Sequence, residues 1–247
     1  MDKITIVTVT YNCVSCLEKT IQSCISQDYK NKEYIIIDGG SSDGTVDLIK
    51  KYSSSINFWL SESDKGIFDA MNKGIKHSTG DWIVFMNAGD FFYNEQTISR
   101  IFQEDVSGYG VIHGKHVAIV DGEIQQREQK PFYAVKKKMR GMGFSHQACF
   151  VKSELARKHL FSPTFRLSAD YNQIYTLYYK EHAKFKQLDF TVAVMNGNDG
   201  ATRRQYMRHL DEVCRICEEA NYCDKLAFKC YHTIRMFYHN IRFKIKK

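Results

Sequence analysis

Two carboxylates in the first half of the chain stand directly after short apolar runs. Asp90 closes the stretch DWIVFMNAGD, in which the run from Trp82 to Met86 ends in a short polar turn. Asp38 follows an earlier apolar run in the same way. Such runs are typical of buried parallel strands, and open α/β sheets bind ligands at the carboxyl ends of these strands. Carboxylate oxygens suit Mg²⁺ and Mn²⁺, so we expect the chemistry at this edge of the sheet.

The elements that must position these carboxylates alternate in type. Apolar and β-branched runs predict four strands, and apolar residues at helical spacing predict a helix after each strand. This repetition predicts an α/β fold with a doubly wound, mostly parallel central sheet and right-handed crossovers. The expected strands are residues 4–9, 33–37, 56–60 and 81–86, and the expected helices lie within 17–25, 46–49, 67–75 and 95–102.

Beyond residue 105 the pattern changes to α+β. The dipeptide Asp121-Gly122 separates two strand-like runs and is a hairpin signal. We expect one domain with a first half, 1–105, and a second half, 106–200, followed by terminal helices in 201–247. The further expected strands are 110–120, 123–128, 148–151 and 184–195, and the further expected helices are 153–158, 167–179, 202–220 and 225–245.

The composition is that of an ordinary globular protein. Of the 247 residues, 43% are hydrophobic and 26% are charged, which excludes a disordered chain. There is no apolar run long enough to span a membrane, and a strand is expected almost at the N-terminus. We therefore expect neither a signal peptide nor a spanning helix, and a cytoplasmic location.

The segment Lys225–Lys247 concentrates the positive charge. It holds seven of the 35 Lys and Arg residues and no Asp or Glu, so the rest of the chain carries 28 charges of each sign. As a helix it would be basic and amphipathic, and such helices lie at anionic membrane surfaces. We expect a peripheral protein at the inner face of the cytoplasmic membrane. Packing on the body or on a partner helix are alternatives, and nucleic acid is the weakest alternative because nothing else forms a basic groove.

The eight cysteines include two pairs with the spacing of zinc ligands, Cys13-x-x-Cys16 and Cys214-x-x-Cys217. Neither pair has the glycines or clustered histidines of a zinc ribbon, and both overlap predicted helices. We favour reduced, unligated thiols over a zinc site.

Four segments of the first half occur in an order typical of one enzyme family. The segments ITIVTVTYN, IIIDGGSSDGT, ESDKGIFDAMNKGI and GDWIVFMNAGD resemble the family-two glycosyltransferases of the GT-A fold over residues 3–92. The chain looks most similar to the bacterial subgroup that builds capsule, exopolysaccharide or lipopolysaccharide, and GFSHQACF and FRLSADYNQIY resemble that subgroup more loosely. The resemblance implies inverting, metal-dependent transfer of a sugar from a nucleotide-diphosphate sugar. A UDP-sugar is the expected donor, and a hydroxyl of a glycan or lipid-linked molecule is the expected acceptor.

The resemblance places the nucleotide at the ends of the first three strands. Asp38 matches a position that accepts a hydrogen bond from the base, beside Thr10 and Tyr11, and a turn residue is its alternative interpretation. Lys65 opens a predicted helix whose N-terminus favours a diphosphate, although a solvated lysine fits as well. Asp64 can position the nucleotide or cap that helix. The expected nucleotide-binding residues are Thr10, Tyr11, Asp38, Asp64, Lys65 and Asn72.

Asp90 is the expected ligand of Mg²⁺ or Mn²⁺, which would neutralise the leaving diphosphate. Family members carry Asp-x-Asp at this turn, and here Asn87 replaces the first carboxylate. The strength of metal binding therefore stays open. We expect Asn87, His146 and Gln147 on the acceptor or donor-sugar side, and a buried, hydrogen-bonded His146 is nearly as compatible with the sequence.

Asp170 stands in Ser168-Ala169-Asp170-Tyr171, which resembles the later acidic motif of the family at a helix start. A carboxylate there can remove the proton of the acceptor hydroxyl, so Asp170 is the expected catalytic base. A helix cap is the alternative.

Two other classes of function compete with transfer. A catalytically inactive nucleotide-sugar-binding or scaffold protein is supported by Asn87 alone, and Asp170 speaks against it. A dinucleotide oxidoreductase requires G-x-G-x-x-G after the first strand, where this chain has Thr10-Tyr11-Asn12.

Overall fold

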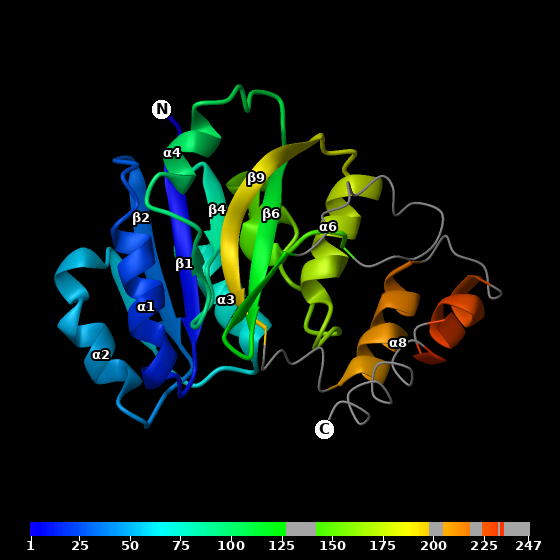
Figure 1. The fold of residues 1–247 in the computed structure, drawn as a ribbon, viewed down its shortest axis with the longest axis horizontal. Helices are drawn as coiled ribbons and strands as arrows, with labels where there is room; N and C mark the ends of the chain where they lie inside the picture. Colours follow the sequence, from blue (N-terminus) through cyan, green and yellow to red (C-terminus); the bar gives the residue numbers. More distant parts are fainter. Residues whose placement is uncertain (127–141, 198–204, 218–223, 232, 235–247) are drawn as a thin grey trace.

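A twisted sheet runs through the computed structural model and carries helices on both faces (Figure 1). The structure describes residues 1–126, 142–197, 205–217, 224–231 and 233–234. Within this part the strand order is β3-β2-β1-β4-β8-β6-β9-β5, with β7 paired to β6. The first four strands of this order are mutually parallel, and β8 joins β4 antiparallel. The strands are β1 Ile4–Thr10, β2 Lys32–Asp38, β3 Phe58–Ser61, β4 Trp82–Phe85, β5 Phe91–Phe92, β6 Val111–Val120, β7 Glu123–Gln126, β8 Cys149–Lys152 and β9 Phe185–Asn196.

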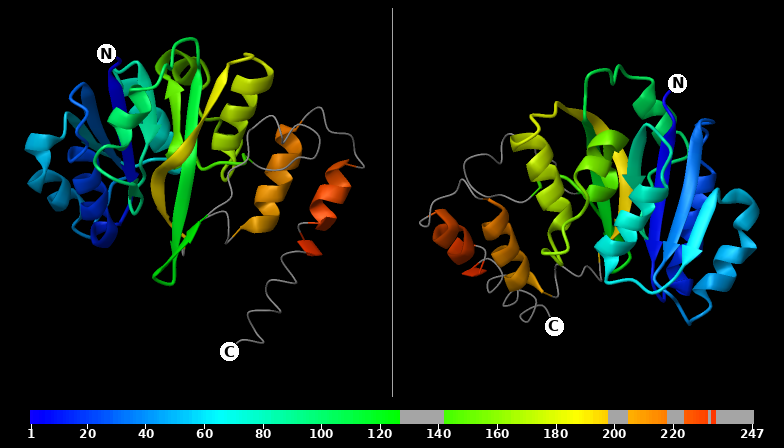
Figure 2. Two further views of the ribbon diagram at one scale, coloured as in Figure 1. Left: turned by 45° about the horizontal axis from the view of Figure 1, so that its top comes forward. Right: turned by 180° about the vertical axis from the view of Figure 1, so that it is seen from behind.

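Two hydrophobic layers separate the helices from the sheet, because alternate residues of a strand point to opposite faces. In β1, Ile4 and Ile6 pack with α1, α2 and α4, whereas Val7 and Val9 pack with α3, α5 and α6. The back view in Figure 2 shows α3 and α6 on the face opposite α1. The described helices are α1 Val14–Ile25, α2 Thr45–Lys51, α3 Ile67–His77, α4 Thr97–Phe102, α5 Ser153–Lys158, α6 Ala169–Tyr179 and α8 Tyr206–Ile216, with 3₁₀ turns η1 Ser53–Ser55 and η3 His146–Ala148.

The predicted α/β class and the four βα units of the first half are confirmed. The third strand begins two residues later than predicted, at Phe58, because the side chain of Asn57 accepts the backbone N–H of Tyr34 before regular pairing starts. The two-residue strand β5, which pairs with β9, was not predicted, since so short a strand leaves no sequence pattern.

The predicted hairpin of the second half is confirmed, and Asp121 and Gly122 both have positive φ at its turn. The last residues of the predicted strand 123–128 lie outside the described residues. β6 and β9 pair in parallel with a register shift near Lys115, a long-range pairing that local patterns do not predict.

The terminal helices are described in part. α8 covers the centre of the predicted helix 202–220, and residues 224–231 and 233–234 are also helical. Phe228 is buried, whereas Leu226 and Ile234 are 50% and 68% exposed. The rest of the predicted basic helix, residues 235–247, lies outside the described residues. None of the helices that the structure describes is both long and apolar enough to cross a bilayer.

Candidate active site

The carboxyl ends of β2, β1 and β4 lie side by side and carry the loops predicted to do chemistry. Thr10 is opposite Asp38 in the parallel register of β1 and β2. On the other side of β1, the N–H of Ala88 donates to the carbonyl oxygen of Val9 (3.1 Å), so the turn after β4 follows the end of β1. The predicted edge therefore forms as the alternation of strands and helices requires.

Asp38 is the last residue of β2, and both oxygens of its carboxylate accept hydrogen bonds from the protein. The side chain is completely buried. One oxygen accepts the backbone N–H groups of Gly40 and Ser41 and the hydroxyl of Ser61, and the other accepts the hydroxyl of Ser41. These bonds shape the loop after β2 and join it to β3. The geometry therefore supports the turn-residue interpretation of Asp38 more than a contact with the base.

Asp64 and Tyr11 converge on the space above Gly39. A Cβ built on Gly39 would lie 2.5 Å from one carboxylate oxygen of Asp64 and 3.3 Å from the Tyr11 ring. The Asp64 carboxylate thus occupies the volume that a side chain at position 39 would fill. Its other oxygen accepts the N–H of Gly66 (2.8 Å), and the Tyr11 ring is 64% exposed. A flat ligand can stack on this ring within reach of Asp64.

The start of α3 is less open to an anion than the sequence suggests. The N–H groups of Lys65 and Gly66 are occupied by the carboxylates of Asp69 and Asp64. Lys65 itself is exposed, so its ammonium group is available to a diphosphate.

Asn72 makes a reciprocal pair with the backbone of Phe161. Its amide nitrogen donates to the carbonyl oxygen of Phe161 and its amide oxygen accepts the N–H of the same residue, both at 2.8 Å. The structure does not bring Asn72 together with Tyr11 and Asp64. Its amide joins α3 to the loop before α6, which argues against the predicted nucleotide contact.

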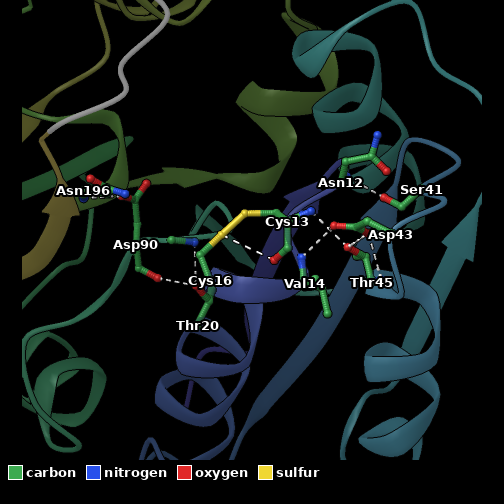
Figure 3. The surroundings of a disulfide bond; sticks show 11 residues. Asn12, Cys13, Val14, Cys16, Thr20, Ser41, Asp43, Thr45, Asp90 and Asn196 are labelled. Carbon is green, nitrogen blue, oxygen red and sulfur yellow. Dashed lines mark hydrogen bonds between the residues drawn. A yellow bond between two sulfur atoms is a disulfide. The ribbon is translucent and has the colours of Figure 1, made fainter.

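The turn after β4 holds Asp90 from three sides. Thr20 of α1 accepts the N–H of Gly89 and donates to the carbonyl oxygen of Asp90. The Asp90 carboxylate accepts the backbone N–H of Asn196 (3.0 Å) and the side-chain amide of Gln147 (2.9 Å). Figure 3 shows Thr20 and Asn196 on opposite sides of Asp90. Burial raises the pKa of Asp90 to about 6, although both hydrogen bonds favour the ionised form.

The fit of a divalent cation depends on oxygen atoms near this turn. The amide oxygen of Asn87 is buried and has no hydrogen-bond partner among the described residues, and the same holds for the hydroxyl of Thr10. Asn87 is therefore a neutral oxygen donor in the same turn as the Asp90 carboxylate, and both suit Mg²⁺ or Mn²⁺. No cluster of three or more His, Cys, Asp or Glu that could hold a metal occurs in the described part of the chain. The residues fit a cation that takes most of its other ligands from a diphosphate.

Cys13 and Cys16 form a disulfide at the start of α1, as Figure 3 shows. The expectation of reduced thiols is wrong for this pair. Cys13 occupies the N-cap position and Cys16 the first turn, and residues three apart on a helix lie on the same face. The Cys16 sulfur would be 3.8 Å from a Cβ on Gly89, so the disulfide packs beneath the Asp90 turn.

Gln147 and His146 share η3 but differ in role. Gln147 contacts Asp90, as noted above, whereas the ring of His146 is buried between Phe85 (5.2 Å between ring centroids) and Phe161 (5.6 Å). Desolvation lowers the pKa of His146 to about 4, so its imidazole is neutral at physiological pH. The geometry favours a structural His146 and a site role for Gln147.

Asp170 lies in the first turn of α6 and is partly buried. One of its oxygens accepts the N–H of Tyr171 (2.8 Å). Desolvation raises the pKa of Asp170 to about 6, and the charge of Glu212 on α8 adds to this effect. The Asp170 charge also contributes, after desolvation, to the raised pKa of Cys149, the first residue of β8. A carboxylate with this pKa can accept a proton near neutral pH.

Several residues that organise the site were not predicted. Thr20, Ser61 and Asn196 hold Asp90 or Asp38 from elements distant in sequence. Ser61 directly precedes the segment ESDKGIFDAMNKGI, and Thr20 is a polar residue on an otherwise apolar helix face, but neither signal identifies the partner.

The sequence profile described as "Glycosyl transferase family 2" matches residues 5–166. An uncharacterized glycosyltransferase of Mycobacterium tuberculosis is 32% identical over 160 residues, which cover 63% of this chain and 60% of that protein. A PGL/p-HBAD biosynthesis glycosyltransferase of Mycobacterium bovis is 31% identical over 99 residues, which cover 39% of each protein. The chain thus spans less than two thirds of the length of these relatives.

Solved structures share the fold. The crystal structure of S. aureus TarS superimposes with a TM-score of 0.67 and 15% identity, covering 90% of this chain and 41% of that one. The mannosyltransferase PcManGT from Pyrobaculum calidifontis, in complex with GDP-Man and Mn²⁺, superimposes with a TM-score of 0.65 and 18% identity, covering 87% of this chain and 63% of that one. Both support the GT-A architecture. The profile match, which covers more than half of the chain, shows that this chain belongs to glycosyltransferase family 2.

Proposed function

We propose that the protein is an inverting, metal-dependent glycosyltransferase that moves a sugar from a UDP-sugar to a hydroxyl group. One observation carries the proposal. The Tyr11 and Asp64 side chains above Gly39 and the Asp90 turn lie at the ends of neighbouring strands, at the same edge of the sheet. A nucleotide diphosphate can span two such positions, with its base at one and its phosphates at the other.

In this proposal the base stacks on Tyr11 and donates its imino N–H to Asp64, while Asp38 shapes the loop beneath. One oxygen of Asp64 already accepts the N–H of Gly66, so the other oxygen is the proposed acceptor for the base. Uracil presents one imino donor, whereas guanine presents an imino and an amino donor side by side and is best matched by both oxygens of a carboxylate. This difference favours UDP, the nucleotide present in one structure of TarS, over GDP, the nucleotide of PcManGT.

Asp90 and the amide oxygen of Asn87 would hold Mg²⁺ or Mn²⁺ against the diphosphate, with Lys65 as a further cation. The metal would supply positive charge that stabilises the leaving UDP. Gln147, through its bond to the Asp90 carboxylate, fixes the orientation of that carboxylate.

Asp170 takes the proton of the acceptor hydroxyl as that oxygen forms its bond to the anomeric carbon. The bond between the anomeric carbon and the diphosphate oxygen breaks in the same step, so the anomeric configuration inverts. The proton ends on Asp170 and the electron pair of the broken bond leaves with UDP.

The acceptor is proposed to be a glycan or a lipid-linked precursor of a bacterial surface polysaccharide, reached at the cytoplasmic face of the membrane. The exposed side chains of Leu226 and Ile234 and the basic character of 225–247 support contact with an anionic bilayer. Truncation after Asp224 should then move the protein from vesicles of anionic lipid to the supernatant in a sedimentation assay. Equal sedimentation of both forms would contradict the membrane contact.

A screen of nucleotide-sugars that measures released nucleotide diphosphate, with and without Mn²⁺, tests the proposed function. We expect release from one UDP-sugar, dependent on metal and stimulated by acceptor. A scaffold protein would instead bind the donor without releasing nucleotide diphosphate. The presence of a single carboxylate in the Asp90 turn is the observation that supports this alternative.

A further inference from the structure

Glu212, whose charge acts on Asp170, is a buried carboxylate with no role yet assigned in the proposed function. It lies on α8 and is 2% exposed. Its two oxygens accept three consecutive backbone N–H groups, those of Arg166 (3.0 Å), Leu167 (2.9 Å) and Ser168 (3.0 Å). The profile of the family ends at residue 166, so Leu167, Ser168 and Glu212 lie beyond the matched region.

These three N–H groups lead directly into α6, where Asp170 stands. Ser168 is the N-cap of α6, yet its side chain makes no capping bond to the helix. Its hydroxyl bonds instead with the Nδ1 atom of His209, also on α8 (2.8 Å). The segment before α6 is thus fixed by two side chains from a helix more than forty residues later in the chain, and not by its own cap.

The same carboxylate acts on Asp170 through space. Glu212 is among the groups that raise the pKa of Asp170, after desolvation. The other groups around this pair are Cys149 on β8, whose pKa responds to Asp170, and Arg208, whose guanidinium is 3.5 Å from Glu212. His209 is held at Ser168. Glu212 is therefore connected to Asp170 both by the backbone that it orders and by its negative charge.

We propose that Glu212 is a positioning residue for Asp170, so that α8 is part of the catalytic unit. The inference rests on the proposed function, in which Asp170 is the base. A carboxylate that binds three N–H groups sets the direction from which α6 begins, and the side chain at its second position moves with that direction. The assignment predicts that a change at Glu212 affects turnover and not donor binding.

The experiment compares E212Q with D211N in the full chain. Both substitutions remove one negative charge from neighbouring positions of α8, but Asp211 is on the exposed side, paired with Lys229. We expect E212Q to lower kcat on the order of 10- to 100-fold with the KM for the donor nearly unchanged, because misplacement of a catalytic group acts on the chemical step. D211N should change neither quantity.

The pH profile separates positioning from simple stabilisation. Removal of the Glu212 charge should lower the pKa of Asp170, so the acidic limb of kcat/KM should move to lower pH in E212Q and stay in place in D211N. The shorter acid in E212D keeps the charge and should leave the limb in place while kcat falls. If E212Q does not fold, this second variant still tests the geometry.

A carboxyl-¹³C NMR titration measures the pKa of Asp170 directly, without turnover. The Asp170 signal is assigned by its loss in D170N, and its titration midpoint is compared between E212Q and D211N. An unchanged titration midpoint in E212Q, or a loss of thermal stability at full kcat, would overturn the inference. Full activity of D170N would instead refute the proposed role of Asp170 as the base. The NMR titration in E212Q would still show whether Glu212 acts on Asp170, because it does not depend on turnover.

Discussion

The proposed donor side and the proposed acceptor side of this site are organised in different ways. In the loops after β2 and β3, the carboxylates of Asp38 and Asp64 bind N–H groups two or three residues further along the chain. On the acceptor side, the segment before Asp170 depends on Glu212, 44 to 46 residues away. These two donor loops are therefore ordered mainly by their own residues, whereas the Asp90 turn and the start of α6 are ordered by residues distant in the chain. Four predictions test this contrast, from the largest expected effect to the smallest.

Substitution of Asp170 by Asn should have the largest effect. Loss of a general base costs roughly 10² to 10⁴-fold in kcat, and the amide keeps the shape of the side chain. Donor binding, measured by calorimetry with UDP, should change less than about twofold because Asp170 is not among the proposed nucleotide and metal contacts. Substantial residual transfer by D170N would show that the acceptor side does not depend on this carboxylate.

Substitution of Asp90 by Asn should lower turnover on the order of 100-fold at a fixed metal concentration, because the turn would lose its charged ligand. The reverse change, Asn87→Asp, adds a carboxylate at the same turn and should tighten Mn²⁺ binding about tenfold. Titration of Mn²⁺ in the presence of UDP measures both. Equal metal affinity in N87D and the unchanged protein would mean that Asn87 does not face the cation.

The rate should also depend on pH through Asp170. Its pKa is raised to about 6, so the ionised, active form is lost as the pH falls below that value. At saturating metal and donor, kcat should fall about tenfold per pH unit below 6. The effect on stability has the opposite sign, because a carboxyl whose pKa is raised by folding favours the folded state at low pH and loses that contribution as the pH rises through about 6. A flat kcat between pH 5 and pH 7 would contradict the assignment.

On the donor side, substitution of Asp64 should affect donor binding, whereas substitution of Asp38 should affect stability. Asp64→Asn should raise the KM for the UDP-sugar on the order of tenfold with little change in stability, because it removes the acceptor for the base. Asp38→Asn should instead destabilise the fold by about 1 to 3 kcal/mol, since one of the two acceptor oxygens becomes an amide donor and the remaining hydrogen bonds lose their ionised acceptor. Thermal unfolding and donor titration of both variants measure this. If Asp38→Asn raised the KM and Asp64→Asn lowered the stability, Asp38 would again be the expected contact with the base.

Much of this fold was predictable from the sequence because its first half is built from local signals. The apolar runs before Asp38 and Asp90 are strands, and Asp121-Gly122 turns a hairpin. For the candidate site, the sequence predicted that polar loops follow β1, β2 and β4, and these loops do lie at one edge of the sheet. It does not show that the Asp38 carboxylate is hydrogen-bonded within its own loop or that Asp64 fills the space above Gly39.

Local sequence patterns could not predict the contacts between residues that are distant in the chain. The bonds of Asn196 to Asp90 and of Glu212 to the segment before α6 join positions more than forty residues apart. Glu212 left one trace in the sequence, as a charged residue within the buried stretch of α8 that contains Leu210 and Val213. A charge on an apolar helix face indicates a buried partner but does not identify it.

The pair between Asn72 and Phe161 has a consequence for how the loop before α6 can vary. It connects the first half of the chain to the second across 89 residues, and on the side of the loop it uses backbone atoms alone. Any residue except proline can offer the same N–H and carbonyl oxygen at position 161. The side chain at this position is restricted by packing instead, because the Phe161 ring is buried against Phe85 and His146. The exposed residues of the loop can therefore change without loosening its hydrogen-bonded attachment to α3.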